Sequence, residues 1–162
     1  MFLIKFIYKH IYNKLFASYK LNYNRSLSLG DYLNDRWERA KKEGFGKGTS
    51  VYDNVLIIGD VKVGKNTWIG PNVVLDGSGG LVIGDYVSIS AGTQIYTHHT
   101  VGWSNSLGEE PIKREPTTIG NGVYIGPNCI IQMGTIIGDK AIIGASTFVN
   151  KDISPGQKYF NK

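Results

Sequence analysis

The chain has 162 residues, the size of a single domain, and 41% of them are hydrophobic. Its formal charge of +5 is modest, and no basic face carries aromatic residues at the spacing of a DNA- or RNA-binding module, so nucleic acid is not an expected partner. The single cysteine, Cys129, excludes an internal disulfide, and a reducing compartment, the cytoplasm, is the default expectation.

The first twenty residues are apolar but are interrupted by Lys5, Lys9 and Lys14. These charges argue against a secretory signal and against a transmembrane span. The segment instead predicts an amphipathic basic helix with one broad apolar face, formed by Phe2, Phe6, Ile7, Ile11 and Leu15. Two hypotheses stay open. The simpler one is that this face docks on the rest of the protein; the other is that residues 1–20 lie on an anionic membrane surface, which would make the protein peripheral on the inner membrane face.

A second helix is predicted over residues 31–43. Ser28 is placed to cap its start, and Gly44 is a plausible end. Within the helix, Asp35 and Arg39 have the i,i+4 spacing of an ion pair. The two helices together define an expected N-terminal helical segment, residues 1–48.

From about Val55 onward a bulky aliphatic residue recurs every six positions, often followed directly by glycine. The thirteen residues in phase are Ile57, Val63, Ile69, Leu75, Ile83, Ile89, Ile95, Ile119, Ile125, Ile131, Ile137, Ile143 and Val149. A helix repeats every 3.6 residues and a strand every two, so a period of six predicts a hexapeptide β-helix. We therefore expect an all-β solenoid over residues 49–162, a parallel β-helix with its aliphatic residues stacked in the core.

The period fails in two places, and function in a repetitive fold is expected where the repeat is broken. Leu75 and Ile83 are eight residues apart rather than six, so the segment DGSGG carries a two-residue insertion that predicts a bulged corner. Residues 96–116 lack the pattern and are rich in polar residues and proline, which predicts one extruded loop.

The two irregular segments are expected to meet. If Leu75 and Ile95 occupy equivalent positions in successive coils, Asp76 lies at the root of the loop. The loop contains His98 and His99, the only histidines outside the N-terminal helix. Histidine is suited to remove a proton near neutral pH, although loop histidines also serve simply as hydrogen-bonding groups.

The hexads, the loop that begins IYTHHTVGW, and the block IGNGVYIGPN…IIGASTFVNKDI are similar to the hexapeptide-repeat O-acetyltransferases that modify sugars, among them galactoside, maltose and polysaccharide O-acetyltransferases. The resemblance covers residues 55–153. It implies a left-handed β-helix, a homotrimer with active sites between neighbouring subunits, and acetyl-CoA as donor, with no metal. The chain departs from the family pattern after Ile153, where relatives usually continue into a proline- and lysine-containing segment and this sequence ends with SPGQKYFNK; either the sequence is truncated there or the CoA end is built differently.

The resemblance also implies roles for residues of the two breaks. His98 matches the position of the family's catalytic base, and His99 falls where relatives often have Asp. Asp76 is expected to orient the histidine or bind a sugar hydroxyl, unless it only turns the corner. Trp103 is expected to stack on the sugar or on CoA, or else to pack against a neighbouring subunit.

Four residues in the later hexads match positions that contact CoA in the family: Gly126, Ala145, Asn150 and Lys151. Small residues there let the pantetheine arm approach the backbone, and Lys151 would meet a phosphate. The alternative is ordinary corner chemistry, since Gly and Ala also suit turns. Cys129 occupies an in-phase position and is expected to be a buried small residue, not a nucleophile.

These observations lead to one main hypothesis, acetyl-CoA-dependent O-acetylation of a sugar hydroxyl on a bacterial surface polysaccharide or its precursor. A close variant transfers the acetyl group to a sugar amine. A non-catalytic trimeric scaffold is a different class of explanation. A zinc-dependent carbonic anhydrase with this repeat would need three histidines spread over adjacent coils, whereas two of the three here are adjacent in sequence.

Overall fold

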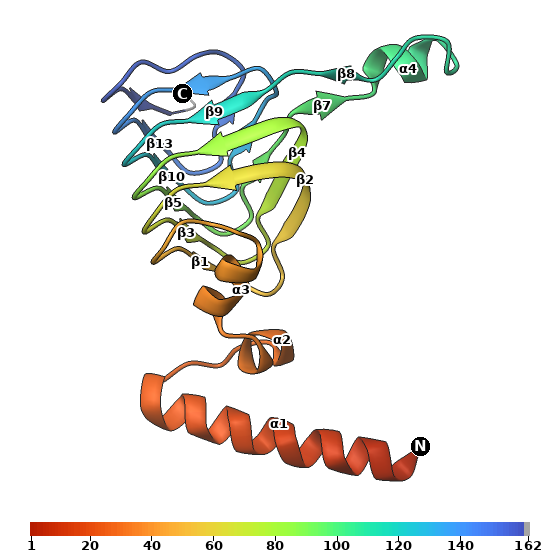
Figure 1. Cartoon of the computed structure of the whole chain (residues 1–162), viewed down its shortest axis with the longest axis vertical. Helices are drawn as coiled ribbons and strands as arrows, with labels where there is room; N and C mark the ends of the chain where they lie inside the picture. The colour runs from red at the N-terminus through yellow and green to blue at the C-terminus, as the bar shows by residue number, and fades with distance from the viewer. Residues whose placement is uncertain (161–162) are drawn as a thin grey trace.

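The computed structural model describes residues 1–160 and consists of an N-terminal helical part followed by a parallel β-helix (Figure 1). The helices are α1 (Phe2–Tyr23), α2 (Leu29–Leu33), α3 (Arg36–Lys42) and α4 (Val101–Asn105). The last of these lies in the loop that leaves the β-helix between its second and third faces (Figure 1).

The β-helix has three faces of short parallel strands. The first face contains β1 (Ser50–Val51), β3 (Trp68–Ile69), β5 (Ser88–Ile89), β10 (Tyr124–Ile125), β13 (Ile142–Ile143) and β15 (Lys158–Tyr159). The second and third faces form one seven-stranded sheet, because β2 (Leu56–Val63) and β4 (Val74–Ile83) continue around the corner between them. The second face is completed by β6 (Gln94–Ile95), β11 (Ile130–Ile131) and β14 (Phe148–Val149), and the third by β9 (Thr117–Ile119) and β12 (Ile136–Ile137).

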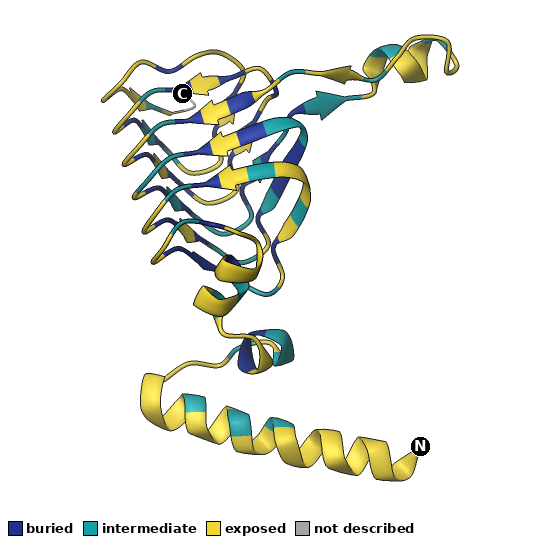
Figure 2. Ribbon diagram, in the orientation of Figure 1, coloured by how far each residue is buried: buried dark blue, intermediate teal, exposed yellow. Residues whose placement is uncertain are grey.

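The in-phase aliphatic residues fill the interior of the β-helix, as their period predicts. Twelve of the thirteen are buried, and Figure 2 shows buried and exposed positions alternating along each coil. The exception is Ile57, which is half-buried in the first coil, where β2 pairs only with β4. Stacking identical positions from coil to coil removes these side chains from water, which is the main stabilising contribution to such a fold.

Most corners, nine in all among the described residues, are closed by a left-handed backbone conformation three residues after the aliphatic position. The residues with positive φ at this place are Asn66, Asn72, Tyr86, Gly92, Gly122, Asn128, Gly134, Lys140 and Ser146. Gly and Asn adopt this conformation at little cost, whereas Tyr86 and Lys140 carry a steric penalty. The tight turn that most hexads require accounts for the high glycine content of the chain.

The predicted helix over residues 31–43 is wrong, because two helices occupy this segment. Asn34 is extended, with φ −112° and ψ 111°, and ends α2. The Asp35 carboxylate accepts hydrogen bonds from the backbone N–H of Trp37 (2.9 Å) and Glu38 (3.1 Å), so it caps α3 and is not paired with Arg39 as predicted. The Arg39 guanidinium instead donates to backbone carbonyls of the first coil and joins α3 to the β-helix.

The predicted cap at Ser28 is confirmed at the start of α2, since its Oγ accepts from Asp31 N at 3.3 Å.

Helix α1 lies at the end of the molecule opposite the C-terminal coils and contacts α2 (Figure 1). Its middle rests on Tyr32, whose ring centroid is 5.8 Å from that of Tyr12 and 5.1 Å from that of Tyr19. These contacts come from Tyr12 and Tyr19 and not from the predicted apolar face, whose residues Phe2, Phe6, Ile7 and Ile11 are exposed, so the predicted docking of that face on the protein is not what the structure shows (Figure 2).

Among residues 1–160, no helix has the length and apolar content that crossing a bilayer requires.

Candidate active site

The two-residue insertion forms a bulge in β4, as predicted. Gly59 of β2 pairs with Gly77, but Val61 pairs with Leu81, so Asp60 alone lies opposite three residues of β4. The bulge packs against the root of the extruded loop. A Cβ on Gly79 would lie 2.4 Å from the carbonyl oxygen of Thr97, so only glycine fits there. The Gly79 N–H donates to Thr97 Oγ1 at 2.7 Å and joins the two irregular segments.

Coil register brings Asp76 to His98. Leu75 pairs with Ile95, as the sequence predicts, so Asp76 follows directly at the base of the loop. Its carboxylate is fully buried and accepts hydrogen bonds from Thr97 N (2.9 Å) and Ser78 N (3.0 Å). The Nδ1 atom of His98 lies 2.6 Å from Asp76 Oδ2.

Asp76 is held as a carboxylate. Burial raises the pKa of Asp76, but hydrogen bonds from Ser78, Thr97 and His98 oppose this and leave the pKa well below its ordinary value. A carboxylate only accepts hydrogen bonds, so the proton between the two groups belongs to Nδ1 of His98. With Nδ1 carrying this proton, Nε2 is the ring nitrogen that can accept one. The His98 side chain is 30% exposed, so another molecule can reach it.

His99 lies beside His98 but is directed elsewhere. The two residues form β7 (His98–His99), which pairs antiparallel with β8 (Lys113–Arg114), and successive strand side chains point to opposite faces. The Nδ1 atom of His99 accepts a hydrogen bond from Val101 N at 3.3 Å, at the start of α4. The structure therefore joins only one of the two predicted histidines to Asp76.

Trp103 lies in α4, at the tip of the extruded loop (Figure 1). Its side chain is exposed, and its carbonyl accepts hydrogen bonds from Gly108 N (2.7 Å) and Ser106 Oγ (3.3 Å) of the same loop. The Trp103 backbone thus belongs to the loop's own hydrogen bonding, while its side chain is open to solvent.

The four residues predicted to contact CoA fall into two pairs at different corners. Ile95, Ile131 and Val149 pair in successive coils, so Asn150 follows at the same corner as the loop root, two coils away. Lys151 is next to it, exposed, with Nζ 5.2 Å from the ring centroid of Tyr159.

Gly126 and Ala145 lie at the other edge of the second face, where β10 and β13 end. A Cβ on Gly126 would lie 2.6 Å from the backbone nitrogen of Ala145, so coil stacking alone requires this glycine. Ala145 is exposed at the same corner. Cys129 is buried as predicted, donates its thiol to the Gly144 carbonyl at 2.9 Å, and has a pKa raised by burial.

Sequence reasoning missed two residues of this site, Ser78 and Thr97. Ser78 Oγ donates to Asp76 Oδ1 at 2.5 Å, and Thr97 Oγ1 donates to the Asp76 carbonyl at 2.8 Å. Both were adjacent to the predicted features, one inside DGSGG and one directly before His98. A buried carboxylate needs several hydrogen-bond donors, so the hydroxyl side chains next to Asp76 and next to His98 were the signal that could have identified both residues.

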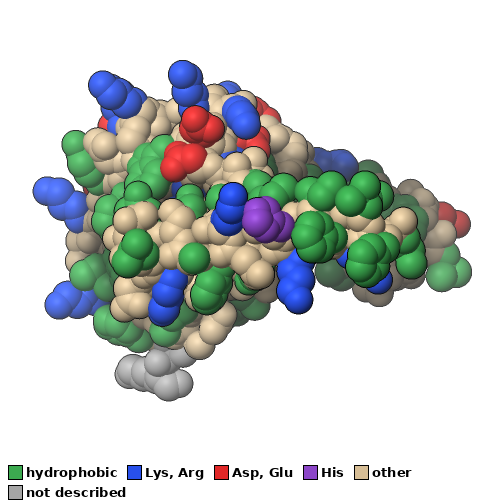
Figure 3. Space-filling model, turned by 90° about the horizontal axis from the view of Figure 1, so that it is seen from below, with side chains coloured by type: hydrophobic (Ala, Val, Ile, Leu, Met, Phe, Trp, Pro, Cys, Tyr) green, Lys and Arg blue, Asp and Glu red, His purple; other side chains and the backbone are tan. Residues whose placement is uncertain are grey.

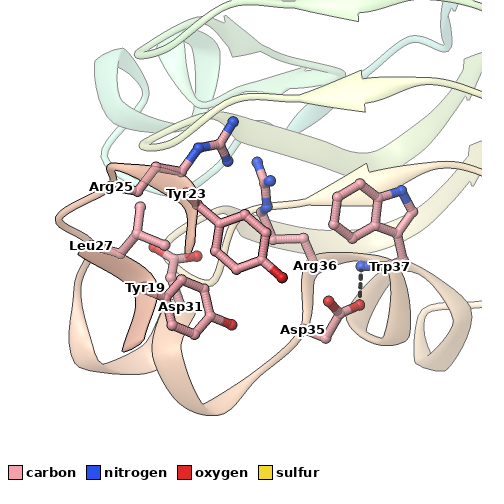
Figure 4. Close-up of a pocket in the computed structure, with 8 residues that line it drawn as sticks. All are labelled: Tyr19, Tyr23, Arg25, Leu27, Asp31, Asp35, Arg36 and Trp37. Atoms are coloured by element: carbon pink, nitrogen blue, oxygen red, sulfur yellow. Dashed lines mark hydrogen bonds between the residues drawn. The ribbon is translucent and has the colours of Figure 1, made fainter. Parts of the chain in front are cut away.

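A separate pocket of about 420 Å³ lies at the root of α1 (Figure 4). Its walls are formed by aromatic, basic and acidic residues: Tyr19, Tyr23, Arg25, Leu27, Asp31, Asp35, Arg36 and Trp37. It shares no residue with the Asp76–His98 pair.

Two hexapeptide patterns match the β-helix. The pattern described as bacterial transferase hexapeptide (six repeats) matches residues 116–151, and the hexapeptide repeat of succinyl-transferase matches residues 60–97. Together they lie on both sides of the extruded loop and include the bulge. The hexapeptide repeat indicates a left-handed β-helix, as the resemblance implied.

Among relatives, the galactoside O-acetyltransferase of Escherichia coli K12 is 36% identical over 104 residues, which are 63% of this chain and 41% of that protein. The carnitine operon protein CaiE of Escherichia coli is 32% identical over 104 residues, 61% of this chain and 53% of that protein. The chain thus spans about half the length of these relatives or less.

Solved structures share the fold. A maltose O-acetyltransferase from Clostridium difficile 630 superimposes with a TM-score of 0.61 at 25% identity, over 94% of this chain and 80% of that one. AntD, an N-acyltransferase from Bacillus cereus whose structure contains dTDP and coenzyme A, superimposes with a TM-score of 0.66 at 22% identity, over 72% of this chain and 67% of that one. The chain is a hexapeptide-repeat protein with a left-handed parallel β-helix, and it is similar to the acetyltransferases built on this repeat.

Proposed function

We propose that the protein is an acetyl-CoA-dependent acetyltransferase that O-acetylates a sugar hydroxyl, with His98 as general base. The observation that carries this proposal is the 2.6 Å contact between His98 Nδ1 and the buried Asp76 carboxylate, at the point where the repeat is interrupted. For general-base catalysis, a histidine needs its Nδ1 held by a carboxylate and its Nε2 able to accept a proton from the substrate, and this arrangement provides both. Similarity to a galactoside and a maltose O-acetyltransferase supports a sugar acceptor.

The reaction needs no acyl-enzyme, because a thioester is already activated. Nε2 of His98 takes the proton of the acceptor hydroxyl while its oxygen bonds to the thioester carbonyl carbon. Asp76 stabilises the imidazolium that forms. The carbon–sulfur bond then breaks, and His98 returns the proton to the departing sulfur, which yields an acetyl ester and free CoA. A base placed in this way contributes about 10²–10⁴ in rate.

Asp76 is proposed to position His98 and not to bind sugar. Its side chain has no exposed surface, and its oxygens already accept hydrogen bonds from Ser78, Thr97 and His98. The predicted contact of Trp103 with sugar or CoA stays a prediction, since the loop tip would meet a ligand only in an assembly or after a change of loop position.

The placement of the CoA residues suggests where the donor lies. Asn150 and Lys151 share a corner with the root of the histidine loop, two coil spacings away, or roughly 10 Å. Gly126 and Ala145 lie at another corner of the same subunit. We infer that both pairs contact one CoA only if the donor lies between two subunits, each contributing a different corner. Lys151 would then attract a phosphate of CoA.

The surface of the β-helix supports an assembly of this kind. Each face presents exposed apolar side chains on its short strands: Trp68 and Tyr124 on the first, Ile130 and Phe148 on the second, Val82 and Ile136 on the third. Ile130 and Phe148 pair on neighbouring strands, whereas Ser88 and Thr118 separate the apolar residues on the first and third faces. Exposed apolar side chains on flat faces favour burial between subunits. A homotrimer is the assembly that we propose.

The test is acetyl-CoA consumption against a panel of sugars, amino sugars and glycan fragments. Turnover with a hydroxyl acceptor and a hydroxylamine-labile product would identify an ester, whereas a stable product would identify an amide and the N-acetyltransferase alternative. His98→Ala is expected to abolish turnover with CoA binding retained, and His99→Ala, the matched control, to keep most of it. Normal turnover by His98→Ala would contradict the assignment, and failure to bind CoA at all would favour a scaffold.

A further inference from the structure

The net charge of the protein resides entirely at its N-terminal end. Five of the 18 basic residues and none of the 13 acidic residues precede Asp31, so the other 13 basic residues balance the acidic ones. The five are Lys5, Lys9, Lys14, Lys20 and Arg25. Residues 1–30 therefore form a cationic segment attached to a body with no net charge.

The same segment exposes most of its apolar side chains. Helix α1 has no buried residue. Eight large apolar or aromatic side chains within the first eleven residues are at least 45% exposed: Met1, Phe2, Leu3, Ile4, Phe6, Ile7, Tyr8 and Ile11. Figure 3, which views the molecule from this end, shows hydrophobic and basic side chains intermingled. So many exposed apolar groups in one short segment indicate an interaction surface.

The helix is held at its C-terminal half and projects at its N-terminal half. Tyr12 and Tyr19 pack edge-on against Tyr32 of α2, which anchors one side of the helix. Beyond them the pocket at the root of α1 is lined by Arg25 and Arg36, which Figure 4 shows directed to the same side. The N-terminal half extends past α2 (Figure 1), and its apolar side chains and Lys5 and Lys9 are exposed.

We infer that α1 docks the protein on the surface of an anionic lipid bilayer. Phenylalanine and isoleucine side chains would enter the boundary between headgroups and acyl chains, while lysine ammonium groups reach outward to lipid phosphates. The cytoplasmic leaflet is anionic and attracts polybasic segments. A second copy of the chain fits this surface less well, because two copies of residues 1–30 would bring together ten basic side chains and no acidic ones. This inference does not depend on the proposed acetyl transfer.

The experiment is flotation of the full chain with vesicles of phosphatidylcholine alone and with vesicles that also contain phosphatidylglycerol. We expect binding to the anionic vesicles that added salt weakens, and little binding to the neutral ones. Lys5→Gln combined with Lys9→Gln is expected to lower the partition coefficient about 30-fold. The matched control is Lys41→Gln combined with Lys42→Gln on the exposed side of α3, which is expected to leave binding unchanged.

A second pair of variants tests insertion of the apolar groups. Phe2→Ser combined with Phe6→Ser is expected to abolish flotation without changing the oligomeric mass. Retained flotation of this variant would show that charge alone holds the protein on the vesicles, and would overturn the proposed insertion of the apolar side chains. A changed oligomeric mass would assign the surface to contacts between copies of the chain. Equal binding of the wild type to neutral and anionic vesicles, or no binding to either, would also overturn the inference.

Discussion

The carboxylate of Asp76 and Nδ1 of His98 lie 2.6 Å apart although 22 positions separate them in the chain. Two features of the fold produce this contact. The pairing of Leu75 with Ile95 sets the two coils in register, and the bulge that follows Asp76 fits against Thr97. The polar site is thus supported by the most regular part of the fold, its aliphatic stack.

Replacing Asp76 with Asn is expected to lower kcat by about 10²–10⁴, because the amide favours the tautomer that carries its proton on Nε2 of His98. The change also sets an N–H₂ group against N–H donors of Thr97 or Ser78, at a cost of about 1–3 kcal/mol in stability. Steady-state kinetics on the folded variant measure the first effect. Asp139→Asn, at a corner where Asp139 Oδ1 accepts from Asn121 N at 2.7 Å, is the control and should retain normal kcat. Equal activity of the two variants would argue against a positioning role for Asp76.

The stability of the protein is expected to depend on pH through Asp76. Its pKa is lowered in the folded state, while the unfolded chain binds a proton near the ordinary value of about 3.9. The unfolded state therefore binds more protons in this range, so the stabilisation is complete above about pH 5 and is lost as pH falls toward the folded-state pKa. Urea denaturation of wild type and Asp76→Asn should be compared from about pH 7 down to about pH 3, which covers the upper part of this transition. The difference in stability between the two proteins should shrink toward the low end of that range. A difference that stays constant with pH would contradict the prediction.

Lys140 is predicted to be a strained corner residue. Its φ is 59°, at a place where Gly or Asn closes most other corners. Lys140→Gly should raise the free energy of unfolding by about 0.5–1 kcal/mol, because the steric penalty of roughly 1–2 kcal/mol exceeds the entropic cost of glycine. Thermal or urea denaturation checks this. The same substitution at exposed Lys65, whose φ is not positive, should lower stability by about 0.5–1 kcal/mol.

Lys151 is predicted to contribute to donor binding and not to the chemical step. Lys151→Ala should raise the KM for acetyl-CoA about fivefold, as expected for one exposed charge pair, and leave kcat unchanged. Lys158→Ala provides a control, because Lys158 is also exposed but lies on the first face in β15. A fall in kcat without a change in KM would place Lys151 in a different role.

The N-terminal helices show where local reasoning reached its limit. Apolar periodicity and i,i+4 charges predicted one helix over residues 31–43, whereas the structure has two, α2 and α3. The Asp35 side chain, however, bonds the backbone N–H of Trp37 and Glu38, and this cap starts a new helix. Aspartate favours caps over helix interiors, and Arg39 anchors α3 to the carbonyls of Tyr52 and Val55.

The six-residue period by itself determined the β-helix, its buried aliphatic stack, the bulge and the register that places Asp76 at the loop root. This was possible because each hexad repeats the same local geometry, so position along the sequence translates directly into position on a face. Tertiary structure alone decided which histidine reaches Asp76, and which corners carry Gly126 and Lys151. These outcomes depend on strand alternation in β7 and on which edge of a face each corner occupies, and neither is encoded in spacing. The exposure of α1 was also decided by the tertiary structure, because α2 is too short to cover more than a few of the apolar side chains of α1.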